Sequence, residues 1–285
     1  MRSVAESEFQ ANAVSSRITS TKNPLLQSVR KLLKRRYRDE LGLVRIEGTR
    51  EIDRALEAGI QFEYAIYCES LSRFERARKT VERLRSAGLQ TLYSTTTEVF
   101  LKFSQWQNPD GLLVVGRQPS TKLHDIQSTV GDIYLVVDGV EKPGNLGSML
   151  RTADATGCAA VIVTDPALDL FNPNVIRASL GTVFSKTCVV VSANDAAEWL
   201  RSSGCRIVAT SPSASVSYLD TNLAGDCAMV IGSEKDGLTE FWLAASDELV
   251  KLPNLGAADS LNAAMSATAL LFESYRQRQS PLTAS

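Results

Sequence analysis

The C-terminal half of the chain alternates short, uninterrupted apolar runs with segments of helical character. The runs are Ile133–Asp138, Ala160–Thr164, Cys188–Val191, Arg206–Thr210, Ala228–Gly232 and Leu249–Leu252. Apolar strands separated by helices are typical of a mostly parallel sheet that is covered on both faces. We therefore predict an α/β domain that ends in a helix over Leu261–Gln277. One face of this helix is expected in the core or at an interface, and it comprises Leu261, Met265, Thr268, Leu271, Phe272 and Tyr275.

The N-terminal part predicts a smaller α/β unit. Residues 1–24 are polar without a period and are expected to form a flexible arm, and Leu25–Tyr37 has the apolar spacing of one helix. Strands are expected at Leu43–Glu47, Phe62–Tyr67, Leu89–Tyr93 and Leu112–Val115, and helices at Arg50–Ala58, Arg73–Ala87 and Glu98–Phe103. We predict a domain over 25–117, a linker over 118–131 and a second domain over 132–285.

Charge is distributed unevenly between these two parts. The formal net charge is −1, yet residues 1–117 hold 20 basic and 14 acidic side chains, whereas residues 118–285 hold 11 and 18. One helix face in the first part is basic and carries Arg30, Lys31, Lys34, Arg35, Arg36 and Arg38. A solvated helix face is the simpler interpretation. Because no Asp or Glu occurs between Lys22 and Asp39, we favour contacts with the phosphate backbone of a nucleic acid.

Several functional classes are disfavoured by the residues that the chain lacks. Its five cysteines are far apart, with no C-x-x-C, which predicts a reducing, cytoplasmic location and no zinc site. No apolar run approaches about 18 residues, so we expect no membrane span. The only histidine, His124, falls in the linker, which weakens mechanisms that need an imidazole base.

Three loops that follow predicted strands carry polar side chains. The loop from Asp138 leads into a helix with Asn145 and Arg151, which we expect to face one crevice. It is rich in glycine, yet it matches neither the dinucleotide-binding G-x-G-x-x-G spacing nor the P-loop. A Pro-Gly turn with a helix cap explains Pro143 and Gly144 but gives no reason for Arg151.

The other two loops point to the same edge of the sheet. One places Gly232 and Glu234 at a strand end, and the other places Ser260 and Asn262 at the start of the last helix. Helix capping alone explains Ser260 or Asn262 taken singly. Because ligands of such sheets bind at the carboxyl ends of the strands, the three loops together predict a binding site there.

In this order and spacing, three segments resemble the motifs of the SpoU/TrmH branch of the SPOUT RNA 2′-O-methyltransferases. They are Asn145-Leu-Gly-Ser-Met-Leu-Arg151, Ile231-Gly-Ser-Glu234-x-x-Gly237-Leu and Leu252-Pro with Ser260-Leu-Asn262-Ala. Arg177-Ala-Ser-Leu-Gly-Thr-Val-Phe184 resembles a segment of the ribosomal-RNA members. The resemblance covers about residues 133–278. The first part, with Ile46-Glu-Gly-Thr-Arg50, is similar to the ribosomal-protein-like RNA-binding domain of such enzymes.

The resemblance implies a trefoil-knotted domain, a homodimer and S-adenosylmethionine as cofactor. The family pattern would hold the cofactor at Gly232, Leu252 and Leu261, with the adjoining Ile231, Ser260 and Asn262. Arg151 is the residue that the family assigns to catalysis, and Asn145, Glu234, Ser260 and Asn262 would orient it, the ribose and the cofactor. Because the free pKa of a guanidinium exceeds about 12, we favour Arg151 as an electrostatic stabiliser rather than a base. Arg50, Arg177 and the basic face would contact RNA.

The expected activity is 2′-O-methylation of RNA, with large-subunit ribosomal RNA as the favoured substrate because of the separate N-terminal domain. A transfer-RNA methyltransferase is one alternative, and a non-catalytic RNA-binding or ribosome assembly factor on the same fold is another. A nucleotide-dependent oxidoreductase is disfavoured by the missing G-x-G-x-x-G.

Overall fold

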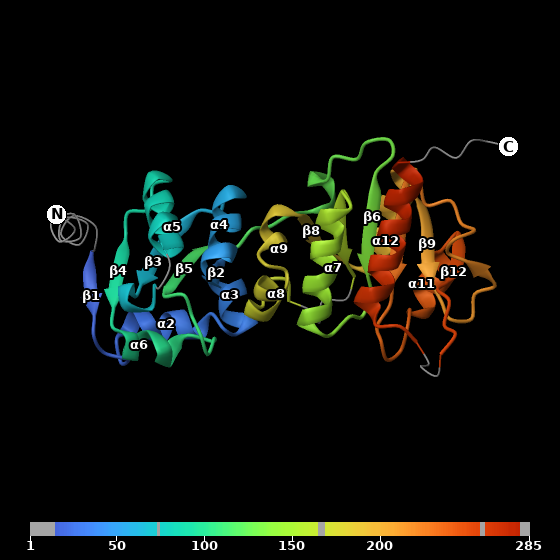
Figure 1. Cartoon of the computed structure of the whole chain (residues 1–285). Helices are drawn as coiled ribbons and strands as arrows, with labels where there is room; N and C mark the ends of the chain where they lie inside the picture. The colour runs from blue at the N-terminus through green and yellow to red at the C-terminus, as the bar shows by residue number, and fades with distance from the viewer. Residues whose placement is uncertain (1–14, 73–74, 165–168, 257–259, 280–285) are drawn as a thin grey trace. The chain divides into compact units, whose positions relative to one another are not determined.

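The computed structural model describes residues 15–72, 75–164, 169–256 and 260–279 of the chain. The chain divides into two compact units. The first comprises the chain up to Pro119 together with Phe171–Arg177, and the second comprises Ser120–Leu170 and the chain from Ala178 onward. Each unit is built on a β-sheet of its own (Figure 1).

The second unit contains a seven-stranded, fully parallel sheet. Its strands are β6 (Ile133–Val137), β7 (Ala160–Val163), β8 (Thr187–Val190), β9 (Arg206–Thr210), β10 (Val216–Ser217), β11 (Cys227–Ile231) and β12 (Glu248–Lys251). Their order is β10-β12-β9-β11-β6-β7-β8. All six predicted strands are present, and the predicted parallel α/β fold is confirmed. The two-residue strand β10 was not predicted, because so short a run carries no periodic signal.

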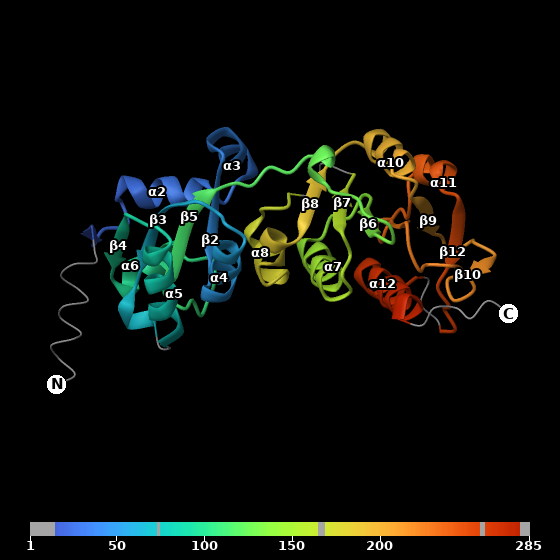
Figure 2. The same cartoon turned by 90° about the horizontal axis from the view of Figure 1, so that it is seen from above.

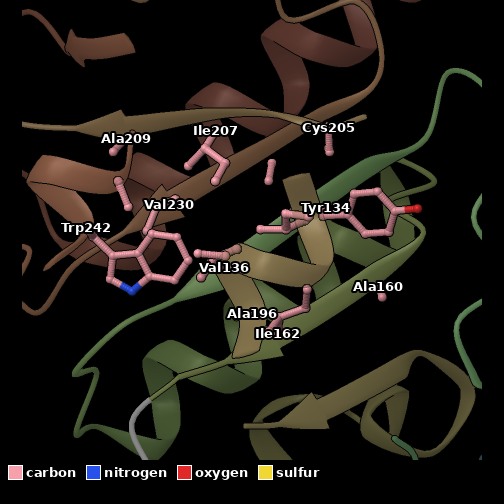
Figure 3. Packing of buried hydrophobic residues seen from close by; sticks show 14 residues of the cluster. Tyr134, Val136, Ala160, Ile162, Ala196, Cys205, Ile207, Ala209, Val230 and Trp242 are labelled. Carbon is pink, nitrogen blue, oxygen red and sulfur yellow. The ribbon is translucent and has the colours of Figure 1, made fainter. Parts of the chain in front are cut away.

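Helices cover both faces of this sheet. They are α7 (Pro143–Ala155), α9 (Thr182–Ser185), α10 (Ala193–Ser202), α11 (Glu240–Ala245) and α12 (Ala263–Gln279), with a 3₁₀ turn at Leu123–Asp125. Figure 2 shows α7 and α12 on one face and α10 and α11 on the other. All five residues of β6 are buried as a result. In Figure 3, Val230 of β11 lies beside the ring of Trp242 of α11, and Tyr134 and Ile207 belong to the same buried cluster.

Helix α7 packs closely on the segment before α9 because Gly147 has no side chain. A Cβ at Gly147 would meet the Cβ of Ala178 and would lie 2.7 Å from the backbone nitrogen of Ser179. We expect Gly147→Ala to lower the free energy of unfolding by about 1–3 kcal/mol through overpacking. Gly144 lies in the same helix with nothing within 4 Å of such a Cβ. Gly144→Ala should therefore leave stability unchanged or raise it by up to about 1 kcal/mol. Urea unfolding of both variants tests this contrast, and equal effects would contradict it.

The first unit contains a five-stranded mixed sheet in the order β1-β4-β3-β5-β2. Its strands are β1 (Ser16–Ile18), β2 (Leu43–Glu47), β3 (Phe62–Tyr67), β4 (Leu92–Thr95) and β5 (Leu112–Arg117). Its helices are α2 (Pro24–Lys31), α3 (Arg35–Leu41), α4 (Thr49–Glu57), α5 (Glu75–Ser86) and α6 (Thr97–Phe103), with a 3₁₀ turn at Glu69–Leu71. Helix α8 (Pro173–Ala178) belongs to this unit up to Arg177. Helices α2 and α6 supply side chains to one hydrophobic core with β3 and β5.

Part of the expected N-terminal arm is a strand. Ser16–Ile18 pairs with β4 in parallel, and the Thr95 hydroxyl donates a hydrogen bond to the Ile18 carbonyl (2.9 Å). Ile18 is buried in the core of the unit. The prediction of a loose arm is therefore wrong for these residues. A strand with one apolar residue gives no sequence pattern, and residues 1–14 lie outside the described part of the chain.

The single helix predicted over Leu25–Tyr37 is two helices, α2 and α3. The chain leaves the helical conformation at Lys34, which is extended (φ −99°, ψ 130°). The guanidinium of Arg38 donates to the carbonyl of Leu32 at the end of α2 (2.5 Å), and Arg38 is buried. Arg38 therefore does not belong to the basic face, because it satisfies a backbone carbonyl that a continuous helix would have used internally.

Candidate functional site

A cavity of about 550 Å³ opens at the carboxyl edge of the parallel sheet. It is formed by the ends of β9, β11 and β12, the loops that follow them, and the start of α12. These three strands are neighbours in the order β12-β9-β11 and run parallel, so their carboxyl ends meet at one place. Five of the residues predicted to hold the cofactor line this cavity: Ile231, Gly232, Leu252, Ser260 and Leu261.

The end of β9 supplies a part of the cavity that the three sequence motifs did not indicate. Thr210, Ser211 and Pro212 line the cavity where β9 ends. The strand Arg206–Thr210 was predicted, and in a parallel sheet its carboxyl end must lie beside those of its neighbours. Its loop could therefore have been included on topology alone.

Asn262 joins the three predicted loops by hydrogen bonds. Its side-chain amide donates to Oδ1 of Asn145 (3.2 Å) and to Oε1 of Glu234 (3.4 Å). Its Oδ1 also accepts from the backbone nitrogens of Ala264 (3.0 Å) and Met265 (3.3 Å). Asn262 thus caps α12 and also links residues that lie 117 and 28 positions away in the chain. The capping interpretation is correct but describes half of its contacts.

Asn145 has an unused hydrogen-bond donor in this cluster. Its Nδ2 is buried and has no partner within the described part of the chain. A buried donor without a partner carries a free-energy cost, so an acceptor supplied by a ligand would relieve it.

The loop after β11 closes tightly on itself beside the cavity. Ser233 and Gly237 exchange backbone hydrogen bonds of 2.9 and 3.2 Å across this loop. A Cβ on Gly232 would collide with the backbone of Gly237 and would lie 2.5 Å from the nitrogen of Leu238. Gly232 therefore allows two backbone segments to touch, and this contact holds Glu234 at the cavity wall.

Asp138 is a buried polar residue near the site that none of the predicted site residues includes. Its carboxylate is 4% exposed and accepts hydrogen bonds from the Thr164 hydroxyl (2.8 Å) and the Thr239 hydroxyl (3.0 Å). Thr164 follows β7, and Thr239 precedes α11. Asp138 therefore ties the ends of β6 and β7 to the start of α11.

Arg151 stands apart from this cluster within one chain. It lies in α7 six residues after Asn145, which in a helix is about 9 Å along the axis and roughly 120° around it. The side chain is exposed, and no contact between Arg151 and Asn145, Glu234 or Asn262 occurs in the structure as described. The expectation that Asn145 and Arg151 face one crevice is not met inside a single chain.

Comparisons with known sequences identify the protein family. The SpoU rRNA Methylase family model matches residues 132–272, and a model of the MRM3-like substrate binding domain matches residues 23–114. A 23S rRNA (uridine(2479)-2′-O)-methyltransferase of Streptomyces viridochromogenes is 31% identical over 99% of both chains. The chain belongs to the SpoU rRNA methylase family.

Solved structures agree with this assignment to the SpoU family. A crystal structure of an RNA 2′-O ribose methyltransferase has a TM-score of 0.82 at 40% identity, over 92% of this chain and 99% of that one. The SpoU methyltransferase AviRb from Streptomyces viridochromogenes, in complex with the cofactor AdoMet, has a TM-score of 0.82 at 29% identity, over 91% and 99%. The predicted family is therefore confirmed.

Other reactive side chains of this SpoU methylase lie outside the cluster. Burial raises the pKa of the Cys158 thiol to about 11 and the pKa values of Cys188, Cys205 and Cys227 to about 12, so these thiols are neutral. The His124 side chain is 75% exposed and lies 3.4 Å from Asp125. Among the described residues, no group of His, Cys, Asp and Glu could hold a metal ion, and no helix is long and apolar enough to cross a bilayer.

The residues predicted to contact RNA fall into three groups. Arg30, Lys31, Lys34, Arg36 and Arg50 are exposed. Arg35 forms an ion pair with Asp39 (3.3 Å), which neutralises part of the basic face. Arg177 belongs to the first unit, where its guanidinium carbon lies 4.0 Å from the ring centre of Trp106.

Replacing Asn262 separates its two structural roles. Asn262→Ala should lower the free energy of unfolding by about 1 kcal/mol because α12 loses its cap. Asn262→Ser keeps a capping oxygen and should leave stability nearly unchanged, but its side chain is too short to reach Asn145 and Glu234. We expect both variants to lower turnover about 10- to 100-fold, since small displacements of reacting groups are costly. Urea unfolding and single-turnover assays measure the two effects, and a fully active serine variant would contradict the linking role.

Proposed function

We propose that this chain transfers a methyl group from S-adenosylmethionine to a ribose 2′-hydroxyl of large-subunit ribosomal RNA. The observation that carries the proposal is the cluster in which Asn262 links Asn145 and Glu234 at the cavity of the parallel sheet. Relatives that span nearly the whole chain are named as 23S rRNA 2′-O-methyltransferases, including RlmP of Bacillus subtilis, which is 28% identical over 90% of this chain and 97% of its own length.

The cavity fits the cofactor in size and in chemistry. Its volume of about 550 Å³ lies within the range of about 300–1,000 Å³ of small-molecule sites. Ile231, Leu252 and Leu261 offer apolar walls and backbone groups, and Glu234 places a carboxylate where a cationic ligand would lie. When bound, S-adenosylmethionine supplies a methyl group that its sulfonium sulfur already activates.

The chain's own residues must align the ribose hydroxyl and stabilise the negative charge that develops on its oxygen. We assign the stabilisation to the Arg151 guanidinium, which also grips the adjacent phosphate, because a guanidinium is a planar cation that offers five donors. The cofactor and the ribose are oriented relative to each other by hydrogen bonds with Asn145, Glu234, Ser260 and Asn262. The buried Nδ2 of Asn145 is the donor available for an oxygen of either molecule.

One experiment tests the activity and its substrate together. The purified protein is incubated with methyl-labelled S-adenosylmethionine and total RNA, and the modified ribose is located by primer extension. We expect a single labelled site in 23S ribosomal RNA. Label confined to transfer RNA would overturn the substrate, and the absence of both label and calorimetric cofactor binding would favour an RNA-binding assembly factor.

We also propose that the two predicted domains divide the work. Residues 25–117 would bind RNA, residues 118–131 would link the domains, and residues 132–285 would bind the cofactor and catalyse transfer. The excess of basic over acidic side chains in the first part and the substrate-binding family model over residues 23–114 support this division. Five buried cysteines without a disulfide support a reducing, cytoplasmic location.

A homodimer through α12 would complete the site. Leu261, Met265, Phe272 and Tyr275 are 41%, 65%, 48% and 43% exposed along one side of this helix and its start. We call these four residues and Thr268, which lies on the same side, the α12 stripe. Thr268 shares a 3.0 Å hydrogen bond with Thr152, the neighbour of Arg151. A second copy on this stripe would bury apolar surface and enclose Arg151. The trefoil knot is part of the same proposal, since the family shares it.

Charged residues in the stripe test the dimer. We expect the double variant Met265→Glu, Phe272→Glu to be monomeric, with a dissociation constant raised at least roughly 100-fold, because burying unpaired carboxylates is costly. Leu243→Glu serves as the control, since Leu243 is 40% exposed on α11, which covers the other face of the sheet. Sedimentation velocity measures the oligomeric state. A dimeric double variant, or a monomeric control, would contradict this interface.

A further inference from the structure

A second cavity, of about 280 Å³, lies in the first unit between α2, α6 and the turn before α2. Three cationic side chains from these three segments line it, namely Lys22, Arg30 and Lys102. Lys102 is 72 positions from Arg30 in the chain. The sequence pattern of the basic face therefore did not indicate that Lys22, Arg30 and Lys102 lie around one cavity. None of the described residues that line the cavity is acidic.

The charges around this cavity are largely uncompensated. Lys22 and Arg30 are exposed, and no ion pair with an Asp or Glu of the described chain neutralises either of them. Lys102 contacts Glu98 at 2.7 Å, but their side chains are 59% and 78% exposed. Ion pairs this exposed contribute little free energy, so Lys102 can exchange Glu98 for another anion.

The backbone that carries these cations is held firmly. The Gln27 amide donates to the Thr21 carbonyl (2.9 Å), which fixes the turn of Lys22 against α2. The buried guanidinium of Arg45 donates to the Phe103 carbonyl (2.8 Å), which fixes the end of α6 next to Lys102. The three side chains therefore start from ordered backbone positions while their charged ends stay exposed to solvent, so little ordering of the backbone remains for binding.

We propose that this cavity holds a backbone phosphate of the RNA substrate, with Lys22, Arg30 and Lys102 as its cationic ligands. The inference rests on the proposed function and specifies where the first unit grips its substrate. A volume just below the range of drug-sized ligands suits one phosphate with part of its ribose rather than a whole nucleotide.

Continuity with the basic face favours a polymer over a small anion. Arg30 lies in α2 beside Lys31, and Lys34 and Arg36 follow, all of them exposed. A free phosphate would contact the three cations of the cavity and leave Lys31, Lys34 and Arg36 without a role. A nucleic-acid backbone that passes through the cavity would also contact these three side chains, as expected where Lys and Arg displace counterions from a nucleic acid.

The whole chain and a fixed set of fragments that together cover 23S ribosomal RNA serve to test this cavity. Dissociation constants are measured by fluorescence anisotropy at several salt concentrations for the triple variant Lys22→Gln, Arg30→Gln, Lys102→Gln. The control triple variant Arg76→Gln, Arg78→Gln, Lys79→Gln removes three charges of α5 that are about half exposed or more and already paired with acidic groups. Thermal unfolding confirms that both variants fold.

We expect the cavity variant to bind RNA roughly tenfold or more weakly at about 0.1 M salt, with a salt slope reduced by about 1. The control should retain the wild-type affinity and slope, and both variants should bind S-adenosylmethionine as wild type does. Equal losses in the two triple variants would mean that net charge alone matters, which overturns the inference, as would unchanged binding by the cavity variant.

Two further readouts separate this inference from the proposed function. If wild-type protein methylates RNA but the cavity variant shows an unchanged KM for RNA, the activity stands and the cavity assignment fails. If no methylation occurs but the cavity variant still loses RNA affinity, the assignment stands without the activity. Calorimetric titration with inorganic phosphate should show no submillimolar binding, and such binding at these residues would assign the cavity to a free anion.

Discussion

Arg151→Ala should lower the turnover number about 100- to 1,000-fold, which is the loss typical of removing one donor that stabilises a developing oxyanion. Arg151 is exposed in α7 and contacts none of Asn145, Glu234 and Asn262 in the described single chain. Its loss therefore removes no packing, and stability should stay within about 0.5 kcal/mol of wild type. Affinity for S-adenosylmethionine should also be unchanged, because Arg151 does not line the cavity.

Two companion variants make this result specific. Arg151→Lys keeps the charge but loses the planar fork of donors, so we expect it to recover only part of the activity. Lys122→Ala removes an exposed cation of the same unit and should be fully active. Single-turnover rates at saturating RNA and cofactor compare the variants. Wild-type rates for Arg151→Ala would refute the assigned catalytic role. Full activity of Arg151→Lys would refute a bidentate contact with the phosphate.

Gly232→Ala should weaken cofactor binding about 10- to 100-fold. The new methyl group cannot fit without moving the backbone of Gly237 and Leu238, and overpacking of this kind costs about 1–3 kcal/mol. Relief of the collision opens the loop that closes through Ser233 and Gly237, and Glu234 moves with it. Affinity for RNA should be unaffected, because the proposed RNA contacts come from the first unit and from Arg151, which does not line this cavity.

The matched control is Gly256→Ala in the loop after β12. A Cβ on Gly256 would meet only Oδ1 of Asn254, at 4.0 Å, so the same chemical change meets no backbone. Isothermal titration calorimetry with S-adenosylmethionine compares the two variants. If Gly232→Ala binds the cofactor as tightly as Gly256→Ala, then the tight turn is not needed for the cavity.

The parallel sheet and the family were predictable because their signals are local and repeated. Each strand of the second unit is a continuous apolar run, and each motif is a short string of residues at a strand end. The inference that strand-end loops meet needs only the parallel direction of the strands, and five of the predicted residues do line one cavity. Their roles in binding and catalysis stay predictions until the variants above are measured.

Features that depend on distant contacts were not predictable in the same way. The break between α2 and α3 depends on how Arg38 meets Leu32 in three dimensions, and the apolar spacing over Leu25–Tyr37 contains no sign of it. Asn262 could be recognised as a cap from local sequence, but its bonds to Asn145 and Glu234 require the loops to be in place. The separation of Arg151 from Asn145 follows from helical geometry, because six residues turn the helix by roughly 120° from the starting side. The motif spacing was interpreted without this rotation.

The division of the chain into units has a practical consequence for dissecting this enzyme. Because Phe171–Arg177 packs with the first unit although both its flanks belong to the second, the polypeptide passes between the units three times. A single cut at the linker therefore does not yield two complete halves. The separated C-terminal fragment would carry Arg177 without the Trp106 ring on which it lies. Complementation between co-expressed fragments is thus a more suitable way than simple truncation to ask what each half contributes.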